Sequence, residues 1–322
     1  MPTQQHIQSH GVQLNVSTRG NPANSAIVLV HGYPDNQQVW KAVAERLAGD
    51  WFVVTYDVRG AGLSDRPVHS RDYRMSLLAT DLEAVVNAVL PDRTFHLVGH
   101  DWGSIQSWES VTGGPIQSRI LSYTTISGPC LDHIGHWLRT RLRHPSPRHF
   151  RQLAGQLASS WYIGAFHLPW LAPMLWNRLL GARWSGYLKS SEGIANVEAN
   201  PYQGQDGRDG IRLYRANIFQ HLLFPRVRYA RCPVQLIVPT DDRYVGSQLF
   251  EGLEDWVPAL YQREIQRGHW LPLSQPGVVA DYIGEFARHM ESSQTCERLA
   301  ACRLSPGRSA ADQPRGRAKK FA

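Results

Sequence analysis

The sequence contains no long apolar run. None of its 322 residues belong to a hydrophobic segment near the roughly 20 residues that a membrane-spanning helix requires. The opening segment, MPTQQHIQSHGVQLNV, also lacks the basic start and the apolar stretch of a secretory signal peptide. We therefore expect no membrane span and no export signal, and we predict a cytoplasmic protein.

Cysteine is scarce, with four residues at positions 130, 232, 296 and 302. No two of them have the C-x-x-C spacing of zinc or redox sites, so we predict neither a metal site nor a disulfide framework. The C-terminal region also lacks a glycine fingerprint behind a strand, and we therefore expect no dinucleotide binding. The sequence predicts a protein that holds no metal and no cofactor.

Acidic residues are outnumbered by basic ones, which gives a formal net charge of +7 at pH 7. Residues 291–322 hold seven Arg and Lys residues but only three acids, so the residues before them carry a net charge of only +3. A nearly balanced main domain predicts no nucleic-acid partner. The 291–322 segment is rich in Ser, Ala, Gly, Pro and Arg, and we expect a basic tail there that is disordered past about residue 305.

Short apolar runs alternate with helical patterns, which is typical of a mostly parallel sheet flanked by helices. After an opening hairpin within 6–20, strands are predicted at 26–32, 52–60, 95–100, 120–127, 233–240 and 261–266, and helices at 37–49, 76–90, 102–112 and 277–290. Between these two groups of strands, helical segments carry five Trp residues. We predict an α/β core over 1–127 and 226–290, with a helical cap over 128–225 inserted after the sixth strand.

One turn carries an unexpected residue type. Gly99-His100-Asp101-Trp102-Gly103 has the G-x-nucleophile-x-G spacing of a nucleophile elbow, a sharp turn from a strand into a helix. Asp101 stands where esterases and lipases carry serine. Because a carboxylate is already ionised at neutral pH, it can attack saturated carbon without a base and form an ester of its own side chain.

Hydrolysis of that ester requires a base and an oxyanion site. His269 follows the last predicted strand and would deprotonate the attacking water, with Asp242 or its neighbour Asp241 supporting the imidazole. The backbone N–H groups of Trp102 and Tyr33 are the expected donors to the oxyanion.

Five ordered motifs resemble the epoxide hydrolase branch of the α/β-hydrolase fold. They are HGYPD (31–35), YDVRGAGLSDRP (56–67), GHDWGS (99–104), DRYV (242–245) and GHWLP (268–272). The resemblance covers roughly residues 6–290. It is greatest with the hydrolase half of bacterial fusions in which a short-chain dehydrogenase domain follows. The chain order nucleophile, acid, histidine matches this fold, and the DRYV motif favours Asp242 over Asp241 as the acid.

The resemblance implies that two cap tyrosines bind the epoxide oxygen. The WYIGAFHLP segment is similar to the first such site and assigns Tyr162 to it. The LYRANI segment is similar to the second and assigns Tyr214 to it. Tyr187 and Tyr202 are the alternatives to this pair. Their phenols would donate to the ring oxygen and protonate the alkoxide. Tyr33 stands where haloalkane dehalogenases often carry an Asn that holds halide.

We therefore predict an epoxide hydrolase that opens a small apolar epoxide to a vicinal diol with water. The predicted catalytic residues are Asp101, Asp242 and His269, and the predicted substrate-binding residues are Tyr162, Tyr214, Tyr33, Trp102 and His31. Two alternatives remain open. One is a haloalkane-type dehalogenase with the same three catalytic residues, and the other is a catalytically silent α/β-hydrolase that binds a small apolar ligand.

Overall fold

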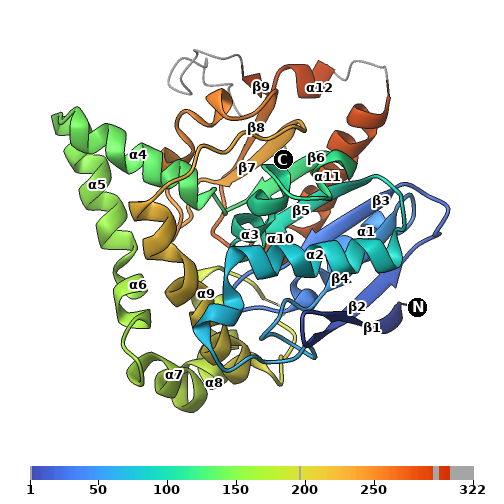
Figure 1. The fold of residues 1–322 in the computed structure, drawn as a ribbon, viewed down its shortest axis with the longest axis horizontal. Helices are drawn as coiled ribbons and strands as arrows, with labels where there is room; N and C mark the ends of the chain where they lie inside the picture. The colour runs from blue at the N-terminus through green and yellow to red at the C-terminus, as the bar shows by residue number, and fades with distance from the viewer. Residues whose placement is uncertain (1, 196, 293–296, 305–322) are drawn as a thin grey trace.

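One sheet forms the centre of the molecule. The structure is a computed structural model that describes residues 2–195, 197–292 and 297–304. Its nine strands have the order β1-β2-β4-β3-β5-β6-β7-β8-β9 (Figure 1). They are β1 (Thr3–Ser9), β2 (Val12–Arg19), β3 (Ala26–Val30), β4 (Phe52–Tyr56), β5 (Phe95–His100), β6 (Ile120–Ile126), β7 (Val234–Pro239), β8 (Leu260–Ile265) and β9 (Arg303–Leu304). The strands from β4 to β8 in this order pair in parallel, whereas the described pairs β1–β2, β2–β4 and β8–β9 are antiparallel.

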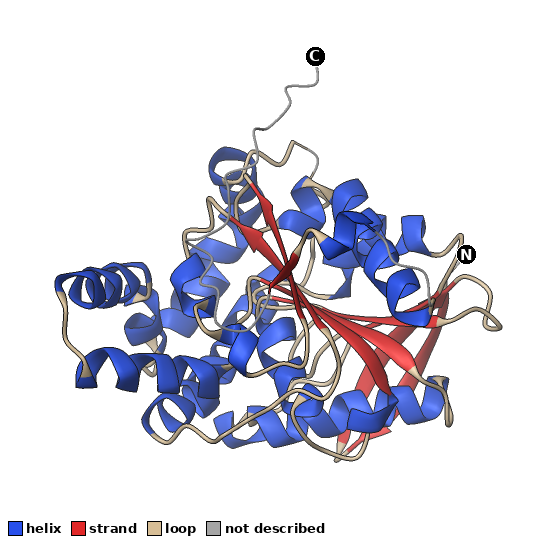
Figure 2. Cartoon of the chain, turned by 90° about the horizontal axis from the view of Figure 1, so that it is seen from above, coloured by secondary structure: helices blue, strands red, loops and turns tan. Residues whose placement is uncertain are grey.

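Helices cover both faces of this sheet because its central strands are apolar on both sides (Figure 2). On β3, Ile27 and Leu29 pack in one core with α1 and α11, whereas Val28 and Val30 pack in the other with α2 and α3. The helices of the core are α1 (Lys41–Leu47), α2 (Met75–Val89), α3 (Trp102–Val111), α10 (Leu271–Ser274), α11 (Pro276–Glu291) and α12 (Glu297–Ala300). The predicted mostly parallel sheet flanked by helices is confirmed.

The chain leaves the sheet after the sixth strand and returns to it at β7. The intervening helices are α4 (Leu131–Arg143), α5 (Pro147–Ser159), α6 (Trp161–Phe166), α7 (Leu171–Leu175), the π-helical turn η4 (Trp176–Leu180), α8 (Gly181–Ser191) and α9 (Gln203–Leu223). We call this group the cap. It covers one side of the core in both views (Figures 1 and 2), and its insertion after the sixth strand agrees with the prediction.

Short 3-10 helices occupy several loops of the core. They are η1 (Gln37–Trp40), η2 (Ser70–Tyr73), η3 (Gln117–Arg119), η5 (Ser247–Phe250) and η6 (Leu253–Asp255). The first of them forms the start of the helix predicted at 37–49, where the side chain of Asn36 accepts a hydrogen bond from the Gln38 N–H. No helix of the described residues combines the length and the apolar character that crossing a bilayer would require.

Part of the segment that was predicted as a basic tail forms regular secondary structure. Residues 297–304 form α12 and β9, and Leu304 of β9 pairs with Leu260 of β8. Leu299 and Leu304 are both buried, so this short segment adds to the core. Two isolated leucines in a basic, Ser- and Ala-rich stretch give no periodic pattern, which is why the sequence did not predict them. The remainder of the predicted tail, 305–322, lies outside the described residues.

Candidate active site

Asp101 is the single residue between the end of β5 and the start of α3. Its φ of 52° and ψ of −123° lie in a region that residues other than glycine rarely adopt. The turn is possible because Gly103 lets α3 approach β3: a Cβ on Gly103 would lie 2.0 Å from the carbonyl oxygen of Val30. The carboxylate is therefore held at the N-terminus of α3, where the helix dipole favours negative charge.

The loop after β3 approaches Asp101 from the side. The backbone N–H of Tyr33 donates to Asp101 Oδ1 at 2.7 Å, and the following Tyr33–Pro34 peptide bond is cis. Gly32 is required at this approach because its Cβ would lie 2.4 Å from the same oxygen. Trp102, which carries the other predicted donor, follows Asp101 as the first residue of α3. One of the two predicted oxyanion donors thus already contacts the carboxylate.

His269 lies between two carboxylates. Its Nδ1 is 2.8 Å from Asp242 Oδ2, and its Nε2 is 3.5 Å from Asp101 Oδ2. The other Asp242 oxygen accepts the backbone N–H groups of Tyr244 and Val245, at 2.8 and 3.0 Å. The structure brings the three predicted catalytic residues together.

The neighbouring carboxylate does not take part in this arrangement. Asp241 is exposed, and its backbone N–H donates to the Arg267 carbonyl at 3.1 Å. The geometry therefore selects Asp242, rather than Asp241, as the partner of the imidazole.

The charges of this group are coupled. Burial opposes protonation of His269, but the charge of Asp242 and the hydrogen bonds that the imidazole donates to both carboxylates outweigh it and raise the pKa of His269 well above its ordinary value. Burial likewise opposes ionisation of Asp242, yet its pKa is lowered by the charge and the hydrogen bond of His269. These shifts favour an imidazolium at His269 that is paired with the carboxylate of Asp242.

Two cap tyrosines lie close enough to Asp101 to be affected by its charge. The ring of Tyr214, on α9, lies 4.8 Å from the Trp102 ring and 5.9 Å from the ring of Tyr162, on α6. Burial raises the pKa of both phenols, and the nearby charge of Asp101 raises them further. Both tyrosines therefore stay neutral at physiological pH, as hydrogen-bond donors must. Tyr187, an alternative from the sequence, instead pairs its hydroxyl with that of Tyr244.

A cluster of aromatic rings packs around Tyr33, beside Asp101. The Tyr33 ring packs edge-on against Phe166, Trp176 and Tyr214 at centroid distances of 5.5, 5.7 and 5.3 Å. Its hydroxyl donates to the Gly207 carbonyl of α9 at 3.0 Å, which joins this loop of the core to the cap.

His31 supports the oxyanion loop from below. Its Nε2 accepts the Val58 N–H at 2.8 Å, so its Nδ1 carries the proton and donates to the Gly32 carbonyl at 3.0 Å. Burial lowers the pKa of His31, which favours this neutral form. Neither ring nitrogen is left for a substrate. These contacts position the Tyr33 loop, and the substrate-binding role of His31 stays a prediction.

Two further buried side chains, Asp35 and His100, contact the loop that carries His269. The Trp270 indole N–H donates to Asp35 Oδ2 at 2.8 Å, and burial raises the pKa of Asp35 to about 7. His100 Nε2 donates to the carbonyl of His269 at 2.9 Å, and burial lowers the pKa of His100 to about 4. These contacts hold the carbonyl group of His269 and the side chain of the next residue, Trp270.

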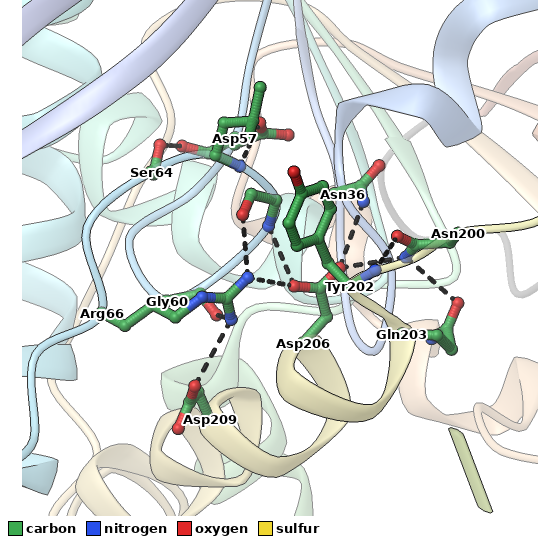
Figure 3. A network of polar contacts seen from close by, with 12 residues as sticks. Asn36, Asp57, Gly60, Ser64, Arg66, Asn200, Tyr202, Gln203, Asp206 and Asp209 are labelled. Carbon is green, nitrogen blue, oxygen red and sulfur yellow. Dashed lines mark hydrogen bonds and ion pairs between the residues drawn. The ribbon is translucent and has the colours of Figure 1, made fainter. Parts of the chain in front are cut away.

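Sequence reasoning missed a polar connection between the cap and the core (Figure 3). Arg66, in the loop after β4, donates to Asp206 at 2.7 Å and to Asp209 at 3.3 Å, both on α9. Asp206 also accepts the Gly62 N–H at 2.9 Å and the Asn36 amide at 3.1 Å. We call this network the cap latch. Its sequence signal is a pair of aspartates three residues apart on one helix, which is too common to predict a partner.

Two residues next to His269 were also missed. The Tyr244 ring lies 5.2 Å from the imidazole ring, edge-on. Glu192, at the end of α8, accepts the Trp270 N–H at 3.5 Å, and burial raises the pKa of its carboxyl group. Tyr244 belongs to the DRYV motif, so only Glu192 had no signal in the sequence.

Known proteins share much of this chain. The mycobacterial protein named "Probable oxidoreductase EphD", from Mycobacterium tuberculosis, is 32% identical over 297 residues, which are 90% of this chain and 50% of that protein. This chain thus spans about half the length of the mycobacterial relative. Epoxide hydrolase 3 of Xenopus tropicalis is 27% identical over 304 residues, which are 88% of this chain and 76% of that protein.

The fold also matches solved structures. The epoxide hydrolase of Bacillus megaterium in complex with an inhibitor has a TM-score of 0.71 at 21% identity, over 88% of this chain and 100% of that one. A likeness at this identity concerns the fold alone. The model of the alpha/beta hydrolase fold family matches residues 25–276, which include the elbow, Asp242 and His269. The chain belongs to the α/β-hydrolase fold family.

Proposed function

We propose that this chain is an epoxide hydrolase that opens an apolar epoxide to a vicinal diol through an ester of Asp101. The observation that carries the proposal is the pairing of an elbow aspartate with two neutral cap tyrosines, the buried Tyr214 and the partly buried Tyr162, whose pKa values are raised by burial and by the charge of Asp101. A halide leaving group needs no proton, whereas an epoxide oxygen leaves as an alkoxide and needs a donor. Relatives whose names include epoxide hydrolase support the same class.

In the first step, Tyr162 and Tyr214 hold the epoxide oxygen by their O–H groups. Asp101 Oδ1 is engaged by the Tyr33 N–H, so the other oxygen, Oδ2, is the nucleophile. It forms a bond to one ring carbon while the carbon–oxygen bond of the ring breaks. The alkoxide takes a phenol proton, which leaves an alkyl ester on Asp101 and a tyrosinate.

Ester formation then lowers the pKa of His269. The ester carries no negative charge, so one of the two groups that raise the pKa of His269 is lost. His269 therefore gives its proton to the tyrosinate. The imidazole and the phenol are both neutral after this transfer, and His269 is ready to act as a base.

In the second step, His269 takes a proton from water and the hydroxide adds to the carboxyl carbon of Asp101. The negative charge forms on Oδ1, where the Tyr33 N–H already lies at 2.7 Å and the Trp102 N–H adjoins it. The bond from this carbon to Oδ2 breaks, the leaving oxygen takes the proton of the hydroxyl group that was added, and the neutral diol leaves with Oδ2. Asp101 is again a carboxylate and His269 an imidazolium, so only epoxide and water are consumed.

A substrate panel tests this proposal. We expect diol release from styrene-type epoxides and little halide release from haloalkanes, with Asp101→Ala as the background for both. The double variant Tyr162→Phe/Tyr214→Phe should lose about 10²- to 10⁴-fold in epoxide turnover. Halide release without diol would replace the proposal with a dehalogenase. Turnover of neither class, or unchanged epoxide turnover in the double variant, would contradict it.

A further inference from the structure

Helix α5 of the cap has an unusual orientation, with polar side chains toward the protein and large apolar side chains toward solvent. Its polar side faces the body of the protein, where Gln152 donates to Glu251 at 2.7 Å and Gln156 accepts from Gln248 at 3.1 Å. Its apolar side faces outward, with Phe150 75% and Leu157 73% exposed. A helix on a soluble protein normally has the opposite orientation, because its apolar face packs on the core. The outward face of α5 therefore lacks a covering surface.

The exposed apolar residues continue along the cap. Helices α5, α6 and α7 follow one another down one edge of the molecule (Figure 1). We define the cap face by its exposed apolar residues Phe150, Leu157, Trp161, Trp170, Leu171 and Met174. Trp170 is 83% and Trp161 72% exposed. Several exposed large apolar side chains along three consecutive helices indicate an interaction surface.

The charge around this face has one sign. From His133 to Ser191 the chain has seven Arg and one Lys but no Asp or Glu. Arg143, Arg151 and Arg178 are exposed, and none of them forms an ion pair with an acid of the described residues. The acid that does approach, Glu251, lies on the inner side of α5 and pairs with Arg148 at 3.0 Å.

We propose that the cap face binds the surface of an anionic phospholipid bilayer. Exposed Trp, Phe and Leu side chains would enter the boundary between headgroups and acyl chains, while the arginines attract the anionic headgroups. This combination of aromatic, aliphatic and cationic residues is typical of helices that lie in a membrane interface. A second copy of the chain is a poorer occupant, because it would bring arginines against arginines.

Helix α6 connects the cap face to the candidate active site. Helix α6 presents Trp161 outward, whereas its next residue, Tyr162, packs with the core aromatic cluster beside Tyr214. If the proposed function holds, membrane binding would bring the cap, which covers the active site, close to an apolar epoxide substrate that is dissolved in the bilayer. Membrane binding itself does not depend on that reaction, and it can be measured without substrate.

Vesicle flotation tests the proposal. The full chain is mixed at low salt with vesicles of equal parts phosphatidylglycerol and phosphatidylcholine, or with phosphatidylcholine vesicles alone. We expect flotation with the anionic vesicles, and at least tenfold less protein on the neutral vesicles. The variants Leu157→Ser/Trp161→Ser/Trp170→Ser and Arg143→Glu/Arg151→Glu/Arg178→Glu should each reduce binding to the anionic vesicles at least tenfold.

A matched control changes exposed residues of the core instead. Val68 is 71% exposed and Arg231 is also exposed, so Val68→Ser/Arg231→Glu should bind anionic vesicles like the wild type. Circular dichroism should show the same melting temperature for all variants, because every changed side chain lies on the surface. Three results would overturn the proposal: no flotation of the wild type, equal binding to both vesicle types, or a dimer in light scattering that the triple serine variant converts to monomer without any flotation.

Discussion

Neighbouring residues of one chemical type can differ completely in role. Asp241 and Asp242 are adjacent in the chain, yet only Asp242 contacts His269, at 2.8 Å. The backbone N–H groups of Tyr244 and Val245 fix its second oxygen, so the carboxylate cannot rotate away without losing two hydrogen bonds. Asp241 points to solvent from the same turn.

This difference gives a matched pair of variants. Asp242→Asn should lower the rate of epoxide turnover by about 10²- to 10⁴-fold, because the base loses the charge that orients and supports it. Asp241→Asn should leave the rate within about twofold of the wild type. Steady-state kinetics at pH 7 measure both. Similar losses in the two variants would contradict the assignment of Asp242.

Asp35 predicts a pH dependence of stability. Its folded pKa of about 7 lies above the ordinary value of 3.8, so the folded state binds this proton more tightly than the unfolded state. The stabilisation is complete below about pH 4 and is lost as the pH rises through 7. Asp35→Asn keeps an acceptor for Trp270 but has no proton to lose.

The free energy of unfolding of Asp35→Asn should therefore rise relative to the wild type between pH 5 and 7. A single group contributes on the order of 1 kcal/mol per pH unit in this range. Urea denaturation of both proteins at pH 5, 6 and 7 measures the difference. A difference that stays constant with pH would mean that Asp35 is ionised throughout.

Among the elements, the cap latch holds α9 onto the loops of the core. Asp206 has a fully buried side chain and accepts hydrogen bonds from Arg66, Gly62 and Asn36. Removal of such a carboxylate leaves buried donors without an acceptor, which costs more than the ion pair itself contributes. The latch thus fixes the cap, and with it Tyr214, over Asp101.

Asp206→Ala should lower the free energy of unfolding by about 3 kcal/mol. The control is Asp281→Ala, which breaks the ion pair between Asp281 and Arg46 on the surface, where the two side chains are 62% and 57% exposed. That change should cost less than about 1 kcal/mol. Urea denaturation measures both variants. Equal losses would show that the latch contributes no more than a surface pair.

At the scale of the whole molecule, the sequence predicted what depends on local pattern. The strands, the elbow glycines and the residues at strand ends follow from runs and spacings of a few residues, and they match the sheet. The Arg66–Asp206 pair was not predictable, because it joins residues 140 positions apart. The outward face of α5 was not predictable either, since periodicity shows that a helix has an apolar side but not which way that side faces.

Isotope labelling tests the central claim, the ester on Asp101, most directly. The enzyme, in excess over a confirmed epoxide substrate, completes one turnover in water enriched in oxygen-18, and the digested protein and the diol are analysed by mass spectrometry. We predict one heavy oxygen in the peptide that contains Asp101, and a diol without label, since its new oxygen comes from Oδ2. A labelled diol with an unlabelled Asp101 peptide would show that water attacks the epoxide directly, and would contradict the account.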